Sequence, residues 1–563
     1  MRSVKKLLGA VSFGILSAVV TPSLGLGAER IAFSYPPFGE FSLSTNSLEL
    51  FAKEGKITNE FNFYASRMTQ QQLAQFRDLL SRRFEVSPTM VSQFTYSPLG
   101  ETVLHRMGEV LRTDSRVNGF YALRSAFILA ATDPEGLTLL NVLRRFPTRS
   151  LRLDLITSQK MVEELSELLK KRDTIVAAIE QVSAQEALAQ PQVDFSGQPD
   201  LRSPGSFKWH KQTLTLVDTT RSDRTLPVDL YLPQVQGASP VVAISHGVAE
   251  NRTTFAYLAR HLASYGFAVA VLEHPGDNAQ RFERFFAGLG KPPTPIEFIN
   301  RPSDVKYLLD KLERRSQSDP NLKGKLNLQQ VGVIGHSLGG YTVLTLAGAT
   351  INFEQLRQFC INNNSLNMST LVQCEAAKLP PATYPVQDER VKAVIAVNPV
   401  SSMLLGESGL SQIQHPLMMV AGSEDIVTPA VPEQIRPFTW LTTPEKYLAL
   451  IKNGTHFSVL DSSDTEENVL PVLPSMIGEN PEVARSYLNA LSVAFLQTHL
   501  ANRPEYRSYL SASYGKFISQ GSLNLSLVQS FSETQLTQAV EQMTSRPTVS
   551  TTELYAAPDE RKQ

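Results

Sequence analysis

Cysteine is nearly absent from this chain of 563 residues, in which only Cys360 and Cys374 occur. Two thiols without nearby histidines cannot complete the four-ligand site that structural zinc requires, so the sequence predicts no bound metal. Both cysteines lie in one polar segment, and an oxidising compartment would permit a bridge between them. A disulfide and a pair of free thiols are therefore open alternatives.

The chain also lacks an excess of charge of either sign. Lysine and arginine together number 53 and aspartate and glutamate 54, which gives a formal net charge of −1 at pH 7. The sequence contains no basic run and no glycine-rich loop of the kind that cradles phosphate. We therefore expect neither a nucleic-acid partner nor a cofactor.

Long apolar runs are missing after the N-terminus. The first residues include Arg2, Lys5 and Lys6, and an uncharged stretch follows from 7 to 28. Its apolar part is shorter than the roughly 20 residues that span a bilayer, and it ends among small residues, which is typical of a signal peptide. We expect residues 1–28 to direct export to a periplasm, a lumen or the medium, with a retained anchor as the alternative.

The length predicts more than one domain, because a single domain usually has about 100–200 residues. Apolar residues at helical spacing predict helices over 70–82, 99–112, 120–131 and 158–189. A polar stretch rich in proline and glycine at 190–206 is typical of a linker. The expected organisation is a signal peptide (1–28), a helical N-terminal domain (29–150), a long helix and linker (151–206), an α/β domain (207–502), and C-terminal helices with a polar tail (503–563).

Beyond the linker the sequence changes to short β-branched runs that alternate with helical patterns. Runs that are apolar on nearly every residue indicate strands covered on both faces, and their alternation with helices indicates a mostly parallel, doubly wound sheet. The predicted strands are 213–217, 228–232, 241–245, 267–272, 331–334, 391–397, 417–420 and 447–451, and a helix at 481–500 closes the sheet. The segment 351–388 is too long for a simple loop and long enough to form a cap over a pocket.

A strand-to-helix turn in this region carries a serine. The strand 331–334 leads directly into Gly335-His336-Ser337-Leu338-Gly339, and a helical pattern follows. The order strand, Gly-x-Ser-x-Gly, helix is the nucleophile elbow of the α/β-hydrolase fold. Side chains at the two glycines would collide with neighbouring backbone in so tight a turn. Ser337 is the predicted nucleophile.

A serine nucleophile needs a base to take its proton. In this fold the chain order is nucleophile, acid, histidine, and of the nine histidines His456 fits, because it follows the strand 447–451. The acid should follow the strand 417–420, where Asp425 would accept the other N–H of the histidine and fix its tautomer. Glu424 is the competing carboxylate.

The oxyanion of the transition state needs two preorganised N–H donors. Leu338, next after the nucleophile, would supply one of them. The other should come from the turn after the strand 241–245, where Gly247 gives the backbone room to turn and the Val248 N–H is our candidate.

Three motifs together carry a family resemblance. They are Ser245-His246-Gly247, Leu272-Glu273-His274-Pro275-Gly276-Asp277 and Gly335-His336-Ser337-Leu338-Gly339-Gly340. Over roughly residues 227–457 the chain resembles the secreted platelet-activating-factor acetylhydrolases and related dienelactone-hydrolase-like proteins. The resemblance implies a triad of Ser337, Asp425 and His456, with Val248 and Leu338 as oxyanion donors. Dienelactone hydrolases proper have cysteine where this chain has serine. The N-terminal half resembles a helical domain of unknown function that precedes such hydrolase domains in cyanobacterial proteins.

These features predict a serine hydrolase that cleaves carboxylic esters, including acyl groups of lipids or phospholipids, through an acyl-enzyme. A peptide or amide hydrolase would use the same three residues and stays an alternative. A non-catalytic envelope protein, binding a partner or a membrane surface through its N-terminal domain, is the alternative from another class. The elbow, with an acid and a base in the right order, favours the enzyme.

Overall fold

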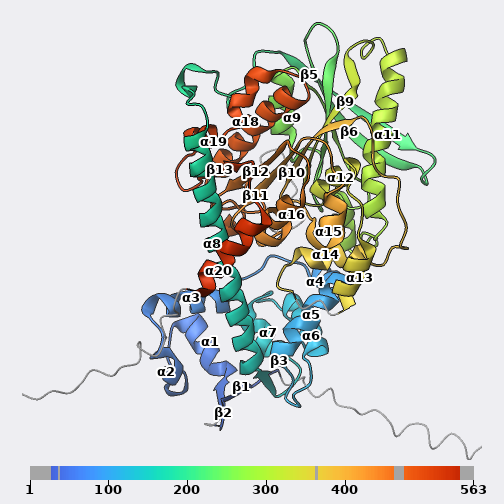
Figure 1. Cartoon of the computed structure of the whole chain (residues 1–563). Helices are drawn as coiled ribbons and strands as arrows, with labels where there is room; N and C mark the ends of the chain where they lie inside the picture. The colour runs from blue at the N-terminus through green and yellow to red at the C-terminus, as the bar shows by residue number, and fades with distance from the viewer. Residues whose placement is uncertain (1–26, 36–38, 362–364, 462–473, 546–563) are drawn as a thin grey trace, which may run out of the picture. The chain divides into compact units, whose positions relative to one another are not determined.

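The computed structural model describes residues 27–35, 39–361, 365–461 and 474–545 (Figure 1). The chain forms two compact units, Met1–Glu164 with Phe285–Gly290, and Leu165–Arg284 with Lys291–Gln563. The division falls inside one long helix, α8 (Leu155–Ala189), and the domain ranges expected from the sequence stay predictions. Most of the expected signal peptide, residues 1–26, and the tail from 546 lie outside the described residues.

In the described part of the first unit, seven helices precede α8, and six of them contribute to a core rich in phenylalanine. Most begin at a serine or threonine whose side chain accepts a backbone N–H three residues on, which satisfies one orphan donor of the first turn. They are α1 (Thr45–Glu54), α2 (Asn59–Ala65), α3 (Gln70–Ser81), α4 (Pro88–Thr95), α5 (Pro98–Val110), α6 (Phe120–Thr132) and α7 (Leu139–Arg145). The helices expected at 70–82, 99–112 and 120–131 are therefore present.

The first unit also contains a small sheet that the sequence analysis did not predict. Its order is β2-β1-β4-β3, with bounds Gly39–Ser44, Arg30–Tyr35, Ser150–Leu153 and Leu111–Arg112. The strands β1 and β4 pair in parallel although more than a hundred residues separate them. Strands of two to six residues are too short to show a clear alternation of apolar and polar residues, and their pairing partners lie far away in the sequence, so this sheet could not be predicted.

A nine-stranded sheet forms the centre of the second unit, in the order β13-β12-β11-β10-β9-β7-β8-β6-β5. The strands from β8 to β12 pair in parallel, and both edges are antiparallel. The bounds are β5 (Trp209–Asp218), β6 (Arg224–Pro233), β7 (Ser239–Ser245), β8 (Ala268–Leu272), β9 (Leu326–His336), β10 (Val391–Val397), β11 (Leu417–Gly422), β12 (Lys446–Ile451) and β13 (Leu525–Val528). The predicted doubly wound, mostly parallel sheet is confirmed, and only the short edge strand β13 was not anticipated.

Helices cover both faces of this sheet, which explains why β8 and β11 are buried at every residue. One face carries α11 (Glu297–Ser318), α12 (Leu338–Leu346) and the second half of α8. The other carries α9 (Ala256–Ser264) and α18 (Pro481–His499) (Figure 1). The remaining helices are η1 (Phe195–Gly197), α10 (Ala279–Phe286), α13 (Phe353–Ile361), α14 (Ser369–Ala376), α15 (Ser402–Leu410), η2 (Val431–Ile435), α16 (Arg436–Trp440), α17 (Pro474–Ile477), η3 (Pro504–Tyr509), α19 (Ala512–Ile518) and α20 (Glu533–Ser545).

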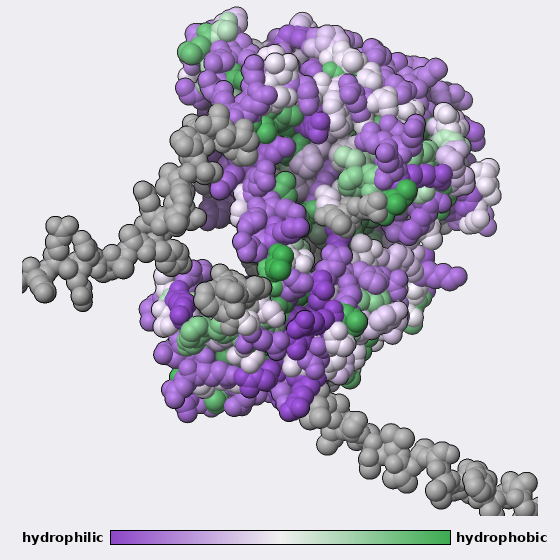
Figure 2. Space-filling view, turned by 60° about the horizontal axis from the view of Figure 1, so that its bottom comes forward, coloured by the Kyte–Doolittle hydropathy of each residue, from purple (hydrophilic) through white to green (hydrophobic). Residues whose placement is uncertain are grey.

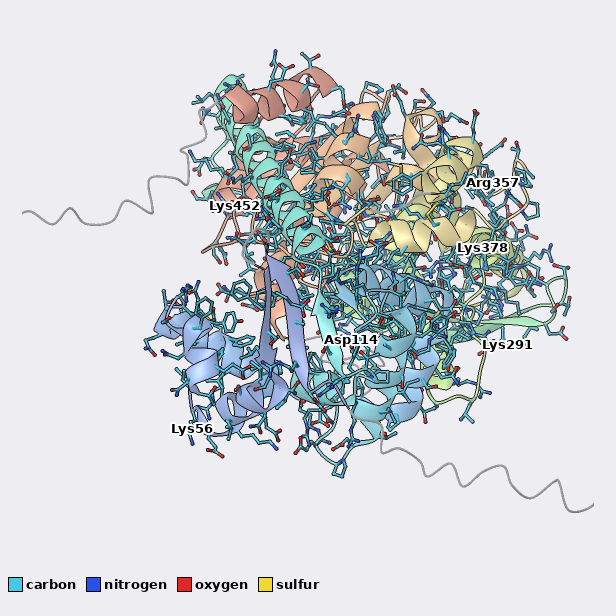
Figure 3. All side chains as sticks on the ribbon, turned by 90° about the horizontal axis from the view of Figure 1, so that it is seen from below. Lys56, Asp114, Lys291, Arg357, Lys378 and Lys452 are labelled. Atoms are coloured by element: carbon cyan, nitrogen blue, oxygen red, sulfur yellow. A yellow bond between two sulfur atoms is a disulfide. The ribbon has the colours of Figure 1, made fainter. Side chains whose placement is uncertain are left out.

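In the long segment after α12, a disulfide joins Cys360 on α13 to Cys374 on α14. This resolves the open choice between a bridge and free thiols. Arg357 on α13 adds hydrogen bonds to the carbonyl oxygens of Ala377 and Leu379, and Figure 3 shows it near Lys378. Both helices of the segment pack against α15.

Among the described residues, no helix combines the length and the apolar composition that crossing a bilayer requires. Figure 2 shows a mainly hydrophilic face on which hydrophobic residues form small separate groups.

Candidate active site

Ser337 lies in a strained turn between β9 and α12. Its backbone has φ 56° and ψ −118°, a region that residues other than glycine rarely adopt. A Cβ added to Gly335 would lie 2.0 Å from the Gly339 oxygen, and one added to Gly339 would lie 2.1 Å from the Ser245 oxygen. Only glycine fits at these two positions, so the local sequence dictates the nucleophile-elbow geometry.

Asp425 and His456 are joined by a hydrogen bond of 2.7 Å between Oδ2 and Nδ1. The other carboxylate oxygen of Asp425 accepts the N–H groups of Val427 and Thr428, at 2.8 and 2.7 Å. Both side chains are buried. A carboxylate held in this way presents one oxygen to the imidazole in a fixed direction.

Glu424 points elsewhere. Its carboxylate forms an ion pair of 2.6 Å with Arg172 of α8, and its side chain is 40% exposed. Of the two carboxylates that the sequence offered for the acid, only Asp425 contacts the histidine.

The loop that carries His456 lies against the elbow. His336, the residue before Ser337, approaches the His456 carbonyl oxygen with its Nε2 at 3.1 Å, and the two rings have centroids 4.6 Å apart. Ser337, Asp425 and His456 follow β9, β11 and β12, whose carboxyl ends share one edge of the sheet. The fold thus brings the three predicted residues to that edge, while their catalytic roles stay predictions.

The two predicted oxyanion donors lie on neighbouring turns. Leu338 is the first residue of α12, where an N–H has no acceptor within the helix. In the turn after β7, the Gly247 N–H donates to Glu250 at 2.7 Å and the Ala249 N–H donates to the Asp277 carbonyl at 2.9 Å. Between them, the Val248 N–H has no acceptor among the described residues. Both N–H groups are therefore free to bind a developing negative charge.

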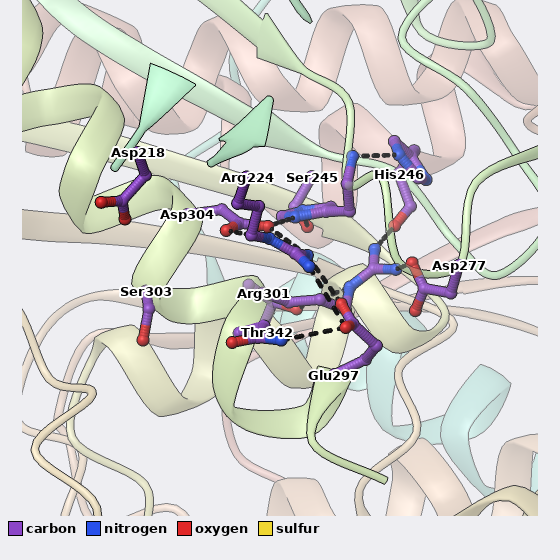
Figure 4. Close-up of polar contacts among 12 residues, drawn as sticks. Asp218, Arg224, Ser245, His246, Asp277, Glu297, Arg301, Ser303, Asp304 and Thr342 are labelled. Atoms are coloured by element: carbon purple, nitrogen blue, oxygen red, sulfur yellow. Dashed lines mark hydrogen bonds and ion pairs between the residues drawn. The ribbon is translucent and has the colours of Figure 1, made fainter. Parts of the chain in front are cut away.

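A buried ionic network that the sequence analysis missed supports this turn (Figure 4). The Arg301 side chain is completely buried and donates to Asp277 Oδ1 at 2.6 Å and to the His246 carbonyl oxygen. The backbone N–H of His274 donates to the ring nitrogen Nε2 of His246 at 3.0 Å. Burial, together with the nearby Arg301, lowers the pKa of His246 and of His274 well below the usual range of histidine, so both act as neutral rings.

The network continues to Asp304 on α11. Asp304 Oδ2 lies 2.9 Å from His274 Nδ1, and Asp304 Oδ1 accepts from Arg224 Nε at 2.8 Å. Arg224 also pairs with Glu297 at 2.6 Å. The only sequence signal was the motif around His274 and Asp277, because Arg301 and Asp304 lie in an ordinary helical pattern.

Another buried carboxylate, that of Glu433, ties the disulfide-bridged segment to the loop that follows β10. Glu433 is fully buried and accepts hydrogen bonds from the bridged segment and from the loop after β10. Its donors are the side chains of Asn367, Ser369, Gln373 and Ser402 and the backbone N–H groups of Ser401 and Ser402. The adjacent Val400 N–H donates to the Ser337 carbonyl at 3.2 Å. The bridged segment therefore connects through buried contacts to the elbow.

A cavity of about 510 Å³ opens beside His456. Ile426, Phe457, Met476 and Leu523 are among its apolar lining residues, and Ser337 is not among them. The cavity thus reaches the loop that carries His456 but not Ser337. Among the described residues, no group of three or more histidine, cysteine or carboxylate side chains is arranged to hold a metal ion.

A mostly parallel sheet with a strained Gly-x-Ser-x-Gly turn after β9, and with loops after β11 and β12 that bring a carboxylate to a histidine, defines the α/β-hydrolase fold. The family model described as "Platelet-activating factor acetylhydrolase, isoform II" matches residues 205–287 and 299–516, which is more than half of the chain. The protein belongs to this family, and the predicted resemblance is confirmed. A second model, described as "Alpha/beta hydrolase of unknown function", matches residues 27–154.

Curated relatives are similar to the chain at low identity. Platelet-activating factor acetylhydrolase of Cavia porcellus is 22% identical over 291 residues, covering 46% of this chain and 57% of the relative. The Bos taurus enzyme is 23% identical over 291 residues, covering 49% and 61%. The Canis lupus familiaris enzyme is 23% identical over 306 residues, covering 52% and 64%. The chain thus spans less than two thirds of the length of these relatives.

Proposed function

We propose that the protein is a serine hydrolase that cleaves carboxylic esters through an acyl-enzyme. The observation that carries the proposal is the 2.7 Å hydrogen bond from His456 to Asp425, in a loop packed against the strained elbow of Ser337. A non-catalytic binding protein would need neither the backbone strain at 337 nor a buried carboxylate behind a histidine.

In the proposed mechanism, His456 Nε2 takes the proton of the Ser337 hydroxyl while the serine oxygen attacks the ester carbonyl carbon. Asp425 stabilises the imidazolium that forms. The Val248 and Leu338 N–H groups bind the oxyanion of the tetrahedral intermediate, and His456 then gives its proton to the departing alcohol. Water, activated by the same imidazole, attacks the acyl-enzyme and releases the acid.

The proposed substrate is an acyl ester of a lipid or phospholipid. The relatives are named for hydrolysing an acetyl group of platelet-activating factor, and family membership supports the same class of ester here. Amide or peptide hydrolysis is the second candidate, because an acyl-enzyme forms from either substrate with the same residues.

Labelling with a fluorophosphonate probe tests the proposed nucleophile. We expect the full-length protein to be labelled stoichiometrically, with the adduct on the peptide that contains Ser337, and Ser337→Ala to take up no probe. A panel of p-nitrophenyl and phospholipid acyl esters beside matched anilides should show faster turnover of the esters. A wild-type protein that is folded but neither labelled nor active would refute the proposal, and faster turnover of the anilides would favour the amide hydrolase.

We also propose that the protein is exported. Residues 2–28 have the composition of a signal peptide, and the Cys360–Cys374 bridge fits an oxidising compartment. Intact-mass measurement of protein isolated from its native cells should show an N-terminus near residue 29 and two cysteines that resist alkylation until reduced. A full-length chain with two alkylated thiols would contradict export.

A further inference from the structure

His336 is a completely buried histidine that the proposed mechanism does not use. It ends β9 directly before Ser337, and both of its ring nitrogens have partners. Nδ1 lies 2.8 Å from Glu250 Oε1, and Nε2 lies 3.1 Å from the His456 carbonyl oxygen. The ring therefore bridges the turn after β7 and the loop after β12.

Glu250 holds a second group of the site. Its other oxygen, Oε2, accepts the Gly247 N–H at 2.7 Å, and Gly247 directly precedes the proposed oxyanion donor Val248. The Glu250 side chain is only 12% exposed. One carboxylate thus fixes both the oxyanion turn and the ring next to the nucleophile.

The hydrogen bonds constrain the protons on this pair. A carbonyl oxygen only accepts, so His336 Nε2 must carry a hydrogen to bond His456. Nδ1 faces a carboxylate oxygen, so a charged pair places a second hydrogen on the ring. Burial opposes the charges, but Glu250 raises the pKa of His336 above its ordinary value, and His336 holds the pKa of Glu250 below its own.

Other charged groups near the pair act in the same direction or are neutral. Asp425, across the site, also favours the protonated form of His336. His246, which faces Glu250, stays neutral because it is buried beside Arg301. The remaining ring neighbours of His336 are Phe255 and His456. The environment therefore supports an imidazolium–carboxylate pair.

We propose that Glu250 and His336 form a charged positioning pair that holds three loops in register: the oxyanion turn at Val248, the elbow at Ser337 and the base loop at His456. Neither residue touches the reacting atoms. The effect on catalysis rests on the proposed function, whereas the protonation state of the pair can be measured without it. Because misplacing catalytic groups by about 1 Å can cost roughly a hundredfold in rate, the pair should affect kcat more than KM.

Two substitutions of Glu250 separate the charge from the hydrogen bonds. Glu250→Ala removes the acceptor for Gly247 and the partner of His336, and we expect kcat for ester hydrolysis to fall by about 10–100-fold with a much smaller change in KM. Glu250→Gln can still accept from Gly247 and donate to a neutral His336, so most of kcat should return. Glu389→Ala, at an exposed position, is the matched control and should leave kcat unchanged.

The pH profile gives a readout that a merely structural role would not move. In the wild-type protein, raising the pH through the elevated pKa of His336 removes its second proton and leaves a ring lone pair facing a carboxylate. We expect kcat to fall on this alkaline limb, and the limb to be absent in Glu250→Gln, whose histidine is already neutral. The proposal would be overturned if Glu250→Ala and Glu250→Gln lost kcat equally and both kept the pH profile of the wild type.

NMR of the ¹⁵N-histidine-labelled full chain tests the pair without any activity. Assigned with a His336→Gln variant, the His336 ring should carry two protons at neutral pH in the wild type and one in Glu250→Gln. A neutral His336 in the wild type would overturn the proposal even if the enzyme is active. A doubly protonated His336 ring in an inactive protein would instead support the charged pair and refute the hydrolase function.

Discussion

Asp425→Asn should lower kcat for ester hydrolysis by about 10⁴-fold while the protein stays folded. Asp425 Oδ1 accepts two backbone N–H groups, so the amide oxygen of asparagine must take that position. The amide nitrogen then faces His456 Nδ1 and donates to it. The imidazole is forced into the tautomer with hydrogen on Nε2, which cannot accept the proton of Ser337. Steady-state kinetics with a p-nitrophenyl ester, with circular dichroism to check folding, measure the effect.

Glu424→Gln is the matched control for this prediction. Glu424 is the neighbouring carboxylate, but it pairs with Arg172 at the surface and does not reach the histidine. We expect its substitution to change kcat less than about threefold, as surface ion pairs contribute little. If the two variants lost the same activity, the assignment of Asp425 as the acid would be wrong.

The core of the second unit could be predicted from the sequence because its pattern is local. Strands such as β8 and β11 are apolar on every residue, since helices cover both of their faces. The elbow could be predicted because its two glycines form a local motif. A Cβ at Gly335 would lie 2.0 Å from the Gly339 oxygen, and one at Gly339 would lie 2.1 Å from the Ser245 oxygen at the end of β7. The contact of Asp425 with His456 followed from chain order, since each residue comes directly after its own strand.

What could not be predicted depends on contacts between distant segments. The pairing of β1 with β4 and the edge strand β13 rest on short runs without a distinctive period. The partners of Arg301 come from the loops after β7 and β8, and nothing in a helical pattern shows that one of its arginines is buried. Glu250 likewise looks like an ordinary loop carboxylate until folding brings it to His336.

Arg301→Met should destabilise the second unit by about 3–5 kcal/mol, which is the usual cost of breaking a buried ion pair. The substitution leaves Asp277 buried without its ion-pair partner, and its Oδ2 already lacks a hydrogen-bond partner among the described residues. The His246 carbonyl oxygen loses its guanidinium donor as well. Both tryptophans, Trp209 and Trp440, lie in this unit, so urea unfolding followed by tryptophan fluorescence reports its stability alone.

The loss of stability should depend on pH with a definite sign. Burial raises the pKa of Asp277 in the folded protein even with Arg301 present, and removing the guanidinium raises it further. A carboxyl group with a raised folded pKa contributes stability that is complete below its unfolded pKa of about 4 and is lost as the pH rises through the folded value. The difference between Arg301→Met and the wild type should therefore shrink as the pH falls from 7 towards 4.

A double variant distinguishes a stranded charge from a general loss of packing. In Arg301→Met with Asp277→Leu, neither charge of this ion pair remains, so Asp277 is no longer stranded and most of the lost stability should return. About 1–3 kcal/mol should stay missing, because the His246 carbonyl oxygen still lacks its donor. Arg436→Met removes an exposed arginine 3.5 Å from Glu533 and should cost less than about 1 kcal/mol. If the double variant were as unstable as Arg301→Met at pH 7, the cost would come from packing around the arginine and not from Asp277.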